Sequence, residues 1–242
     1  MEKNAEPDSK KISAVAFDLD GTLYPNYRLY IQLFPFLIKE QKFLRAFGKA
    51  RDRLRQEAPH SIGLYKDPGG LRFYQRQAQY MGEILKEDPA YLALKTERFV
   101  YRGWEPHFKK VKLYSHVSET LRRLRDRGIK LGLLSDFPPG KKIENLGLSG
   151  LWDTMLCSEI IGWLKPDPRA FLELARTMEL PPEEILYVGN SYSYDVLGAR
   201  KAGMKAAWIR PMARFLGLLP GKKDKADFIF YDYRQLYNYV LN

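Results

Sequence analysis

Short apolar runs alternate with helical patterns over most of the chain. The first run, residues 12–17, contains β-branched residues and stops at Asp18-Leu19-Asp20-Gly21, which is typical of a buried strand. Five later runs have the same character and are predicted to be strands: residues 129–134, 155–157, 185–188, 206–209 and 227–231.

Helical patterns separate these runs. Val117, Leu121 and Leu124 fall on one face of a predicted helix, and Gly128 follows as its stop signal. Strands that alternate with helices of this length indicate βαβ units, and therefore a parallel sheet covered on both faces. The fold class is predicted to be α/β. Further helices are predicted over residues 170–178, 196–202 and a final segment ending near Leu241.

Residues 24–112 follow a different pattern. They lack comparable strand signals and are rich in Arg, Lys, Gln, Tyr and Phe at helical spacing. Roughly ninety residues are too many for a plain loop between two strands. We therefore predict an all-helical subdomain, residues 24–112, inserted into a core made of residues 1–23 and 113–242. Four arginines of this insert are expected to form the solvated side of one helix: Arg45, Arg51, Arg53 and Arg55.

Composition narrows the class of protein. With 242 residues and 45% hydrophobic content, the chain can bury a full core. Its single cysteine, Cys157, cannot form an intramolecular disulfide, which fits a reducing compartment. We find neither a signal peptide pattern nor an apolar stretch that could cross a bilayer, and therefore expect a cytoplasmic protein without membrane contact.

A formal net charge of +11 favours acidic partners. The basic residues are dispersed and no nucleic-acid-binding motif is found, so nucleic acid is not expected as a partner. A small phosphorylated metabolite fits the charge better. The oligomeric state does not follow from the sequence.

Polar side chains occur where the predicted strands end. Ligands of open α/β sheets bind at the carboxyl ends of the strands, so these side chains are expected to converge at one edge. Taken singly, each fits a turn, a helix cap or a surface position equally well. In combination they indicate a reactive site. The residues are Asp18 and Asp20 after the first strand, Ser135 and Asp136 after the second, Lys165 before a helix, and Asn190 and Asp195 after the fourth strand.

This combination resembles the haloacid dehalogenase superfamily, in particular its phosphatase branch. The segments that carry the resemblance span most of residues 12–209. The large insert resembles the helical cap of the family's first subclass (C1 type), and the family fold implies a Rossmann-like core. The matching segments are Asp18-Leu19-Asp20-Gly21-Thr22-Leu23, Leu133-Leu134-Ser135-Asp136, Lys165-Pro166-Asp167-Pro168, and Gly189-Asn190-Ser191-Tyr192-Ser193-Tyr194-Asp195.

The resemblance implies a two-step reaction through an aspartyl-phosphate. Asp18 would be the nucleophile and Asp20 the general acid and base. Ser135 and Lys165 would bind the phosphate. The family also implies a Mg²⁺ ion, and the ligands would be Asp18, the backbone carbonyl of Asp20, and Asp195, with Asn190 as a further candidate.

The cap is expected to set substrate specificity because it would close over the phosphate site. Candidate substrate contacts are Tyr24, Asn26 and Arg28, and, further along the insert, Arg72 and Tyr74. Taken singly, each of them is more typical of a surface or packing residue than of a substrate contact.

Two positions depart from the family pattern. Asn190 stands where an aspartate usually follows the glycine, and Asp136 stands where an asparagine is common. A carboxylate at position 136 would repel phosphate unless it is paired or faces away. Three hypotheses therefore stay open: a Mg²⁺-dependent phosphatase for a sugar phosphate, phosphoglycolate or a nucleoside monophosphate; a catalytically weakened protein that binds a phosphorylated ligand or a protein partner; and a phosphomutase. Because carbon–halogen cleavage needs no acid at position 20, Asp20 favours phosphate chemistry.

Overall fold

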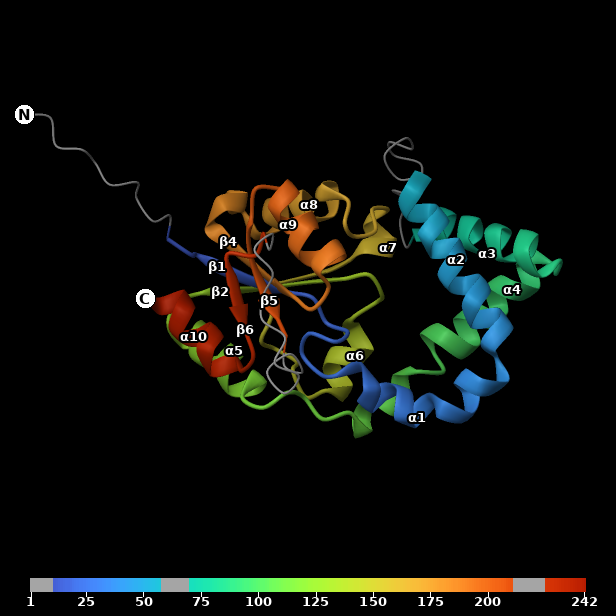
Figure 1. Ribbon diagram of the computed structural model, residues 1–242, viewed down its shortest axis with the longest axis horizontal. Coiled ribbons are helices and arrows are strands. Elements are labelled where there is room, and N and C mark those ends of the chain that lie inside the picture. Colours follow the sequence, from blue (N-terminus) through green and yellow to red (C-terminus); the bar gives the residue numbers. More distant parts are fainter. Residues whose placement is uncertain (1–10, 58–69, 211–224) are drawn as a thin grey trace, which may run out of the picture.

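The computed structural model describes residues 11–57, 70–210 and 225–242. Six parallel strands form one sheet in the order β3-β2-β1-β4-β5-β6. Figure 1 shows this sheet between two layers of helices, with a further group of helices beyond one end. The strands are β1 (Ala14–Phe17), β2 (Lys130–Ser135), β3 (Thr154–Cys157), β4 (Ile185–Gly189), β5 (Lys205–Ile209) and β6 (Phe228–Phe230).

Alternate side chains of the central strand point to opposite faces of the sheet. Val15 and Phe17 join the core beneath α5 and α10, whereas Ala14 and Ala16 join the core beneath α8 and α9. Both faces are thus covered, as the continuous apolar runs require. The covering helices are α5 (Val117–Asp126), α10 (Tyr233–Leu241), α8 (Pro168–Met178) and α9 (Leu197–Lys201).

The α/β fold class and all six predicted strands are confirmed. The four covering helices also lie where the sequence predicted them, with bounds that differ by a few residues. Two short helices were not predicted, α6 (Gly140–Asn145) and α7 (Ser158–Ile161), and they are too short to show an apolar period. A 3₁₀ turn, η5 (Pro182–Glu184), precedes β4, and a π-helical turn, η6 (Tyr192–Val196), precedes α9.

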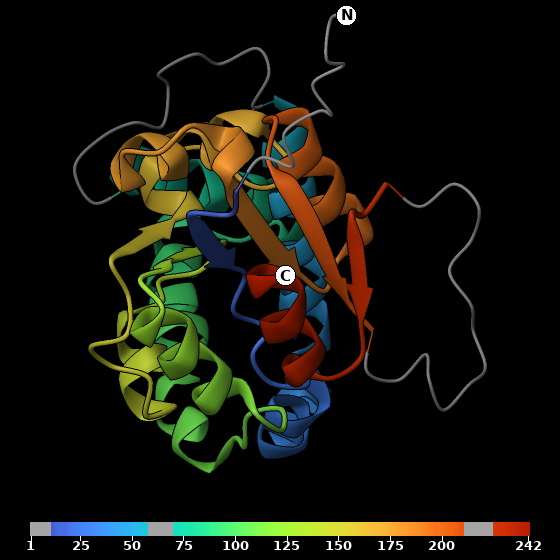
Figure 2. The ribbon, with the colours of Figure 1, turned by 90° about the vertical axis from the view of Figure 1, so that its left-hand side faces the viewer.

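Between β1 and β2 the described chain is helical apart from turns and one isolated bridge between Asp20 and Tyr24. Leu29 of α1 and Phe108 of η4 belong to the core beneath α5 and α10, whereas α2, α3, α4 and η3 pack around a separate apolar core that includes Phe43, Phe73 and Leu92. In the view of Figure 2 the helices between β1 and β2 lie behind the sheet. No described helix is long and apolar enough to cross a membrane. The helices are α1 (Asn26–Lys39), α2 (Gln41–Glu57), α3 (Leu71–Leu85), α4 (Pro89–Thr96), the π-helical η3 (Glu97–Tyr101) and the 3₁₀-helical η4 (Glu105–Lys110).

The prediction that four arginines of α2 form a solvated side is wrong for Arg51 and Arg55. The Arg51 side chain is only 4% exposed and forms an ion pair with the fully buried Glu159 of α7. Arg55 binds Asp136, 3.0 Å away, at the end of β2. A buried charge has to be paired, and both partners come from distant parts of the sequence. These two pairs join α2 to the sheet domain.

Candidate active site

The carboxyl ends of β1, β2 and β4 bring the predicted residues together. Asp18 follows β1 directly, Ser135 is the last residue of β2, and Asp195 lies in η6 after β4. Lys165 reaches them from the loop before α8. All four side chains are buried. The sequence-based expectation of one shared sheet edge therefore agrees with their positions.

Lys165 lies between the two buried carboxylates. Its Nζ atom is 2.7 Å from an oxygen of Asp18 and 2.7 Å from an oxygen of Asp195. Burial alone would lower the pKa of Lys165, but Asp18 and Asp195 raise it well above the ordinary value. Lys165 also donates to the hydroxyl of Tyr187, 3.2 Å away, and that hydroxyl donates to the carbonyl of Leu134. The ammonium is thus charged and fixed in direction.

Asp18 lies in a strongly desolvated environment. Burial raises its pKa to about 7; Lys165 opposes the rise, and the charges of Asp195 and Asp20 add to it. One oxygen accepts from Lys165, and the other accepts from the Thr22 hydroxyl at 2.7 Å. Both contacts hold the carboxylate at the end of β1, where it can face a ligand.

Glycine at position 189 makes the position of Asp195 possible. A Cβ atom at this position would overlap the side chain of Asp195, which folds back over the end of β4. The second oxygen of Asp195 accepts the backbone N–H of Ser191 at 2.9 Å. The Gly189-Asn190-Ser191 turn therefore fixes the carboxylate that faces Lys165.

Asp20 is held by two side chains, one of which the sequence did not single out. Tyr24 donates its hydroxyl to one carboxylate oxygen of Asp20. Lys142 of α6 contacts both oxygens, at 3.0 and 2.7 Å. A six-residue helix has no periodic signal that could have shown which side of α6 faces the site, so Lys142 was missed.

Asp136 is paired and does not present a free charge. Its oxygens accept from the backbone N–H of Lys165 at 3.2 Å and from Arg55 at 3.0 Å, and Arg51 lies 3.9 Å away. Burial acts to raise the pKa of Asp136, but Lys165, Arg55 and Arg51 together lower it. The carboxylate is therefore ionised and neutralised by the cations around it.

The remaining candidates occupy different places. The side-chain oxygen of Asn190 accepts from the Thr22 hydroxyl at 3.2 Å, next to Asp18. Tyr24 is fully buried, with its hydroxyl on Asp20. Asn26 lies beside Gly21, and Arg28 donates to the carbonyls of Lys112 and Leu113, where the chain leaves the helical insert. Arg72 is exposed on α3, whereas Tyr74 lines a cavity described below.

The buried carboxylates of the site offer oxygen donors of the kind that a hard metal ion binds. Among the described residues, no three His, Cys, Asp or Glu side chains surround a common point. The buried carboxylates of Asp18 and Asp195 instead share the single ammonium of Lys165. Two negative charges therefore face one positive charge. Mg²⁺ binds through one or two carboxylates, other oxygens and water. These residues therefore fit Mg²⁺.

The chain is similar to proteins of one known family. A family model of haloacid dehalogenase-like hydrolases matches residues 12–203. Glyceraldehyde 3-phosphate phosphatase of Methanopyrus kandleri is 30% identical over 214 residues, covering 82% of this chain and 84% of that protein. The 5-amino-6-(5-phospho-D-ribitylamino)uracil phosphatase YigB of Escherichia coli is 28% identical over 209 residues, covering 83% and 84%.

The fold has counterparts among solved structures. The L-2-haloacid dehalogenase RSc1362 aligns with a TM-score of 0.65 and 24% identity, covering 96% of this chain and 100% of that chain. At this identity the likeness concerns the fold alone. The family model covers well over half of the chain, including all four segments that carry Asp18, Ser135, Lys165 and Asp195. The chain belongs to the haloacid dehalogenase-like hydrolase family.

Proposed function

We propose that this hydrolase is a phosphatase that cleaves a small phosphorylated metabolite through an aspartyl-phosphate on Asp18. The observation that carries the proposal is the placement of Lys165 between Asp18 and Asp195, 2.7 Å from each, with Asp20 held beside them. The phosphatase names of the two relatives above support it. The candidate substrates remain a sugar phosphate, phosphoglycolate and a nucleoside monophosphate.

In the first step, a carboxylate oxygen of Asp18 forms a bond to phosphorus while the bond to the leaving alcohol oxygen breaks. Asp20 gives its proton to that oxygen. Lys165 neutralises charge on the nucleophile and the phosphoryl group, and Ser135 donates a hydrogen bond to a phosphoryl oxygen. The Ser135 hydroxyl can do so because, among the residues that the structure describes, its one hydrogen-bonding contact is the backbone N–H of Phe137, which it accepts at 3.1 Å, so its own proton is retained for donation.

In the second step, a water oxygen attacks phosphorus, and the bond between phosphorus and Asp18 breaks. Asp20, now ionised, accepts the proton of that water. Inorganic phosphate leaves and Asp18 is free again. Covalent catalysis of this kind replaces one difficult displacement by two easier ones.

We further propose that Asp18, the backbone carbonyl of Asp20, and Asp195 would hold Mg²⁺ at this site, with Asn190, which contacts the same Thr22 hydroxyl as Asp18, as a further candidate ligand. When bound, the ion would supply positive charge that offsets the charge on the phosphoryl oxygens. The shared contact of Asp18 and Asp195 with the single ammonium of Lys165 supports this proposal, because two buried carboxylates face only one cation there.

Residues 24–112 are proposed to act as a cap over the site. Arg55 of α2 supports this role because it contacts both phosphate-binding segments. The Arg55 side chain binds the Asp136 carboxylate at 3.0 Å, and its Nε donates to the carbonyl of Lys165 at 3.0 Å. A cap that contacts the residues next to Ser135 and Lys165 can couple its closure to their position.

Three other activities are distinguishable from this one. The likeness to a dehalogenase fold raises carbon–halogen cleavage as a candidate, but Asp20 would have no role in it. A phosphomutase would share the first step and return the phosphoryl group to the substrate. A weakened ligand-binding protein is less favoured than it was from sequence alone, since Asp136 is neutralised by Arg55.

The test is phosphate release from a panel of phosphorylated metabolites, with Mg²⁺ and with a chelator. Chloride release from 2-chloropropionate is measured in parallel. The proposal expects Mg²⁺-dependent phosphate release that Asp18→Asn abolishes, and no chloride release. It is refuted if no substrate gives Mg²⁺-dependent phosphate, or if Asp18→Asn matches the wild type.

A further inference from the structure

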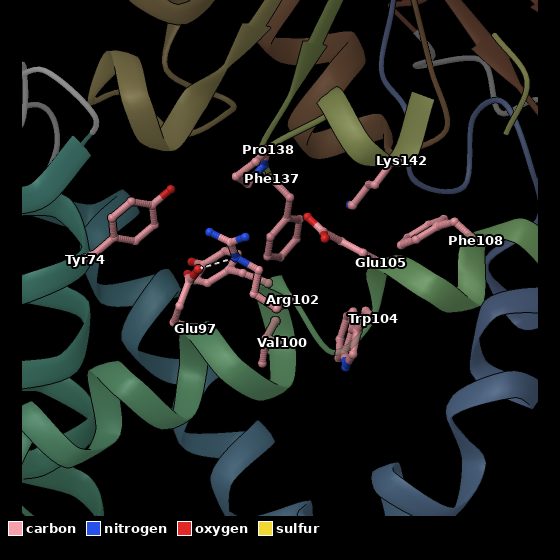
Figure 3. Close-up of a pocket in the computed structure, with 11 residues that line it drawn as sticks. Tyr74, Glu97, Val100, Arg102, Trp104, Glu105, Phe108, Phe137, Pro138 and Lys142 are labelled. Atoms are coloured by element: carbon pink, nitrogen blue, oxygen red, sulfur yellow. Dashed lines mark hydrogen bonds and ion pairs between the residues drawn. The ribbon is translucent and has the colours of Figure 1, made fainter. Parts of the chain in front are cut away.

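A cavity of about 270 Å³ lies between the helical insert and the end of β2. Figure 3 shows that its lining side chains come from α3, η3, η4, the segment after β2, and α6. Its volume is near the lower end of the range for small-molecule sites. Five aromatic residues contribute to its wall: Tyr74, Tyr101, Trp104, Phe108 and Phe137.

Three of these aromatic residues form one uncharged surface. The ring centroids of Tyr74 and Tyr101 are 5.3 Å apart, and those of Tyr101 and Phe137 are 6.3 Å apart. The Tyr101 hydroxyl donates to the buried carboxylate of Glu159, at 3.0 Å, away from the cavity wall. Burial, followed by the charge of Glu159, raises the pKa of both Tyr74 and Tyr101. Neutral ring surfaces therefore face the cavity.

The cavity adjoins the side of the site where the leaving group has to be. Lys142 lines the cavity and also contacts both oxygens of Asp20, the residue assigned to protonate the leaving oxygen. Its Nζ atom lies 4.9 Å from the ring centroid of Phe137 and 5.1 Å from that of Phe108. An alcohol whose oxygen is at Asp20 would thus extend past Lys142 onto aromatic rings.

The charged groups of the wall do not favour an acidic leaving group. Arg102 forms an ion pair with Glu97 at 2.7 Å, and the charge of Lys142 is shared with Asp20. In Figure 3 the Glu105 carboxylate and the Lys142 ammonium both point toward the ring of Phe137. Glu105 would repel a second anion and could accept a hydrogen bond from a ring N–H or an amino group.

On the basis of the phosphatase function proposed above, we infer that this cavity binds the leaving group, and that the substrates are phosphate monoesters of alcohols carrying one planar aromatic or heteroaromatic ring. A flat ring packs on an aromatic wall in an offset-stacked or an edge-to-face arrangement, and either arrangement buries apolar surface. Stacking of this kind accepts different heteroaromatic rings, because each of them has a π-face.

Two matched substrate pairs test the inference. The first is 2-phenylethyl phosphate against ethyl phosphate, and the second is uridine 5′-monophosphate against ribose 5-phosphate. Within each pair the phosphate is on a primary alkyl oxygen, so the difference reports on the ring. Stacking predicts a kcat/KM higher by about tenfold or more for the ring-bearing member. Phosphoglycolate, which carries a carboxylate, is expected to be a poorer substrate than ethyl phosphate.

Variants place the effect in the cavity. Phe137→Leu should lower the ratio of kcat/KM between 2-phenylethyl phosphate and ethyl phosphate several-fold. Phe99→Leu is the matched control, because Phe99 belongs to η3 but stacks on Phe36 at 5.9 Å and does not line the cavity. It should leave the ratio as it is in the wild type.

Binding is measured separately so that the two proposals can fail independently. Calorimetry with 2-phenylethylphosphonate and ethylphosphonate, which cannot be hydrolysed at this bond, is expected to show tighter binding of the first. A preference in either substrate pair, lost in Phe137→Leu, supports the inference. Equal kcat/KM within both pairs, or a preference for phosphoglycolate, overturns it while the phosphatase function stands. If no substrate is hydrolysed, the proposed phosphatase function is refuted. Equal affinities for the two phosphonates would then overturn the inference about the cavity as well.

Discussion

Lys142 of α6 contacts both carboxylate oxygens of Asp20, at 3.0 and 2.7 Å, although the two residues are 122 positions apart in the sequence. Tyr24 donates to one of the same oxygens. The proposed acid and base is therefore held in one orientation by a cation and a phenol. Asp18, by contrast, is held by Lys165 and Thr22. The two aspartates of one short motif thus have separate supporting groups, which suits their separate roles.

Replacement of Lys142 is predicted to impair catalysis by releasing Asp20. Lys142→Met should lower kcat by about tenfold or more on ethyl phosphate, since positioned proton transfer contributes at least that much. Lys142→Arg, which keeps the charge, should recover part of the loss. Steady-state kinetics measure both.

The neighbouring lysine provides the control. The Lys141 side chain is 61% exposed and pairs with Glu144 at the surface. Lys141→Met is expected to retain wild-type kcat. If Lys142→Met and Lys141→Met behave alike, Lys142 does not position Asp20.

Arg51 is predicted to matter for stability more than any exposed arginine of the same helix. Arg51→Met leaves Glu159 buried without its partner, which costs about 3–5 kcal/mol of the free energy of unfolding. Arg53→Met, at a side chain that is 47% exposed, should leave the free energy of unfolding close to that of the wild type. Urea denaturation measures both values. Adding Glu159→Gln to Arg51→Met should recover part of the loss, whereas equal losses for Arg51→Met and Arg53→Met would show that the pair carries no special weight.

The raised pKa of Asp18 predicts a pH dependence of stability without Mg²⁺. The folded-state pKa of about 7 lies above the unfolded value, so the folded protein holds the proton more tightly. The contribution is fully present below about pH 4 and is lost as the pH rises through about 7. In a chelator, the wild type should therefore gain stability relative to Asp18→Asn when the pH is lowered from 7.5 to 5, by an amount on the order of a few kcal/mol. A stability difference that does not change with pH would contradict this assignment.

Gly189 is predicted to be required for the position of Asp195. In Gly189→Ala the new methyl group would overlap the Asp195 side chain and displace it. The concentration of Mg²⁺ that gives half-maximal activity should rise, with a loss of kcat. Gly140→Ala on α6 is the control, since a Cβ atom there meets nothing within 4 Å. Similar Mg²⁺ dependence in the two variants would argue against Asp195 as a ligand.

The sequence alone was sufficient to predict the site residues that follow the strands. Asp18, Ser135 and Asp195 each follow a short apolar run, and parallel strands necessarily bring their carboxyl ends to one edge. Lys165 was singled out at the start of a predicted helix, and the family resemblance of its Lys-Pro-Asp-Pro segment then gave it a role. These residues could be predicted because their positions follow from the order of strands and helices.

The supporting residues could not be predicted in this way. Arg51 and Glu159 are 108 positions apart, and nothing local distinguishes Arg51 from the exposed Arg53. Lys142 lies in a helix without an apolar period. From the sequence, an unpaired Asp136 was expected to repel phosphate, and its contact with Arg55 could not be predicted. Partners of this kind depend on how the insert packs on the sheet domain, which the pattern of a single sequence does not encode.

The central claim is that Asp18 carries the phosphoryl group. The direct measurement is mass spectrometry of the protein quenched in acid during turnover of ethyl phosphate with Mg²⁺, followed by peptide mapping. One phosphoryl group should be found on the peptide containing Asp18 in the wild type, and none should be found in Asp18→Asn. Steady release of phosphate with no phosphoryl group on Asp18 at any quench time would contradict the account.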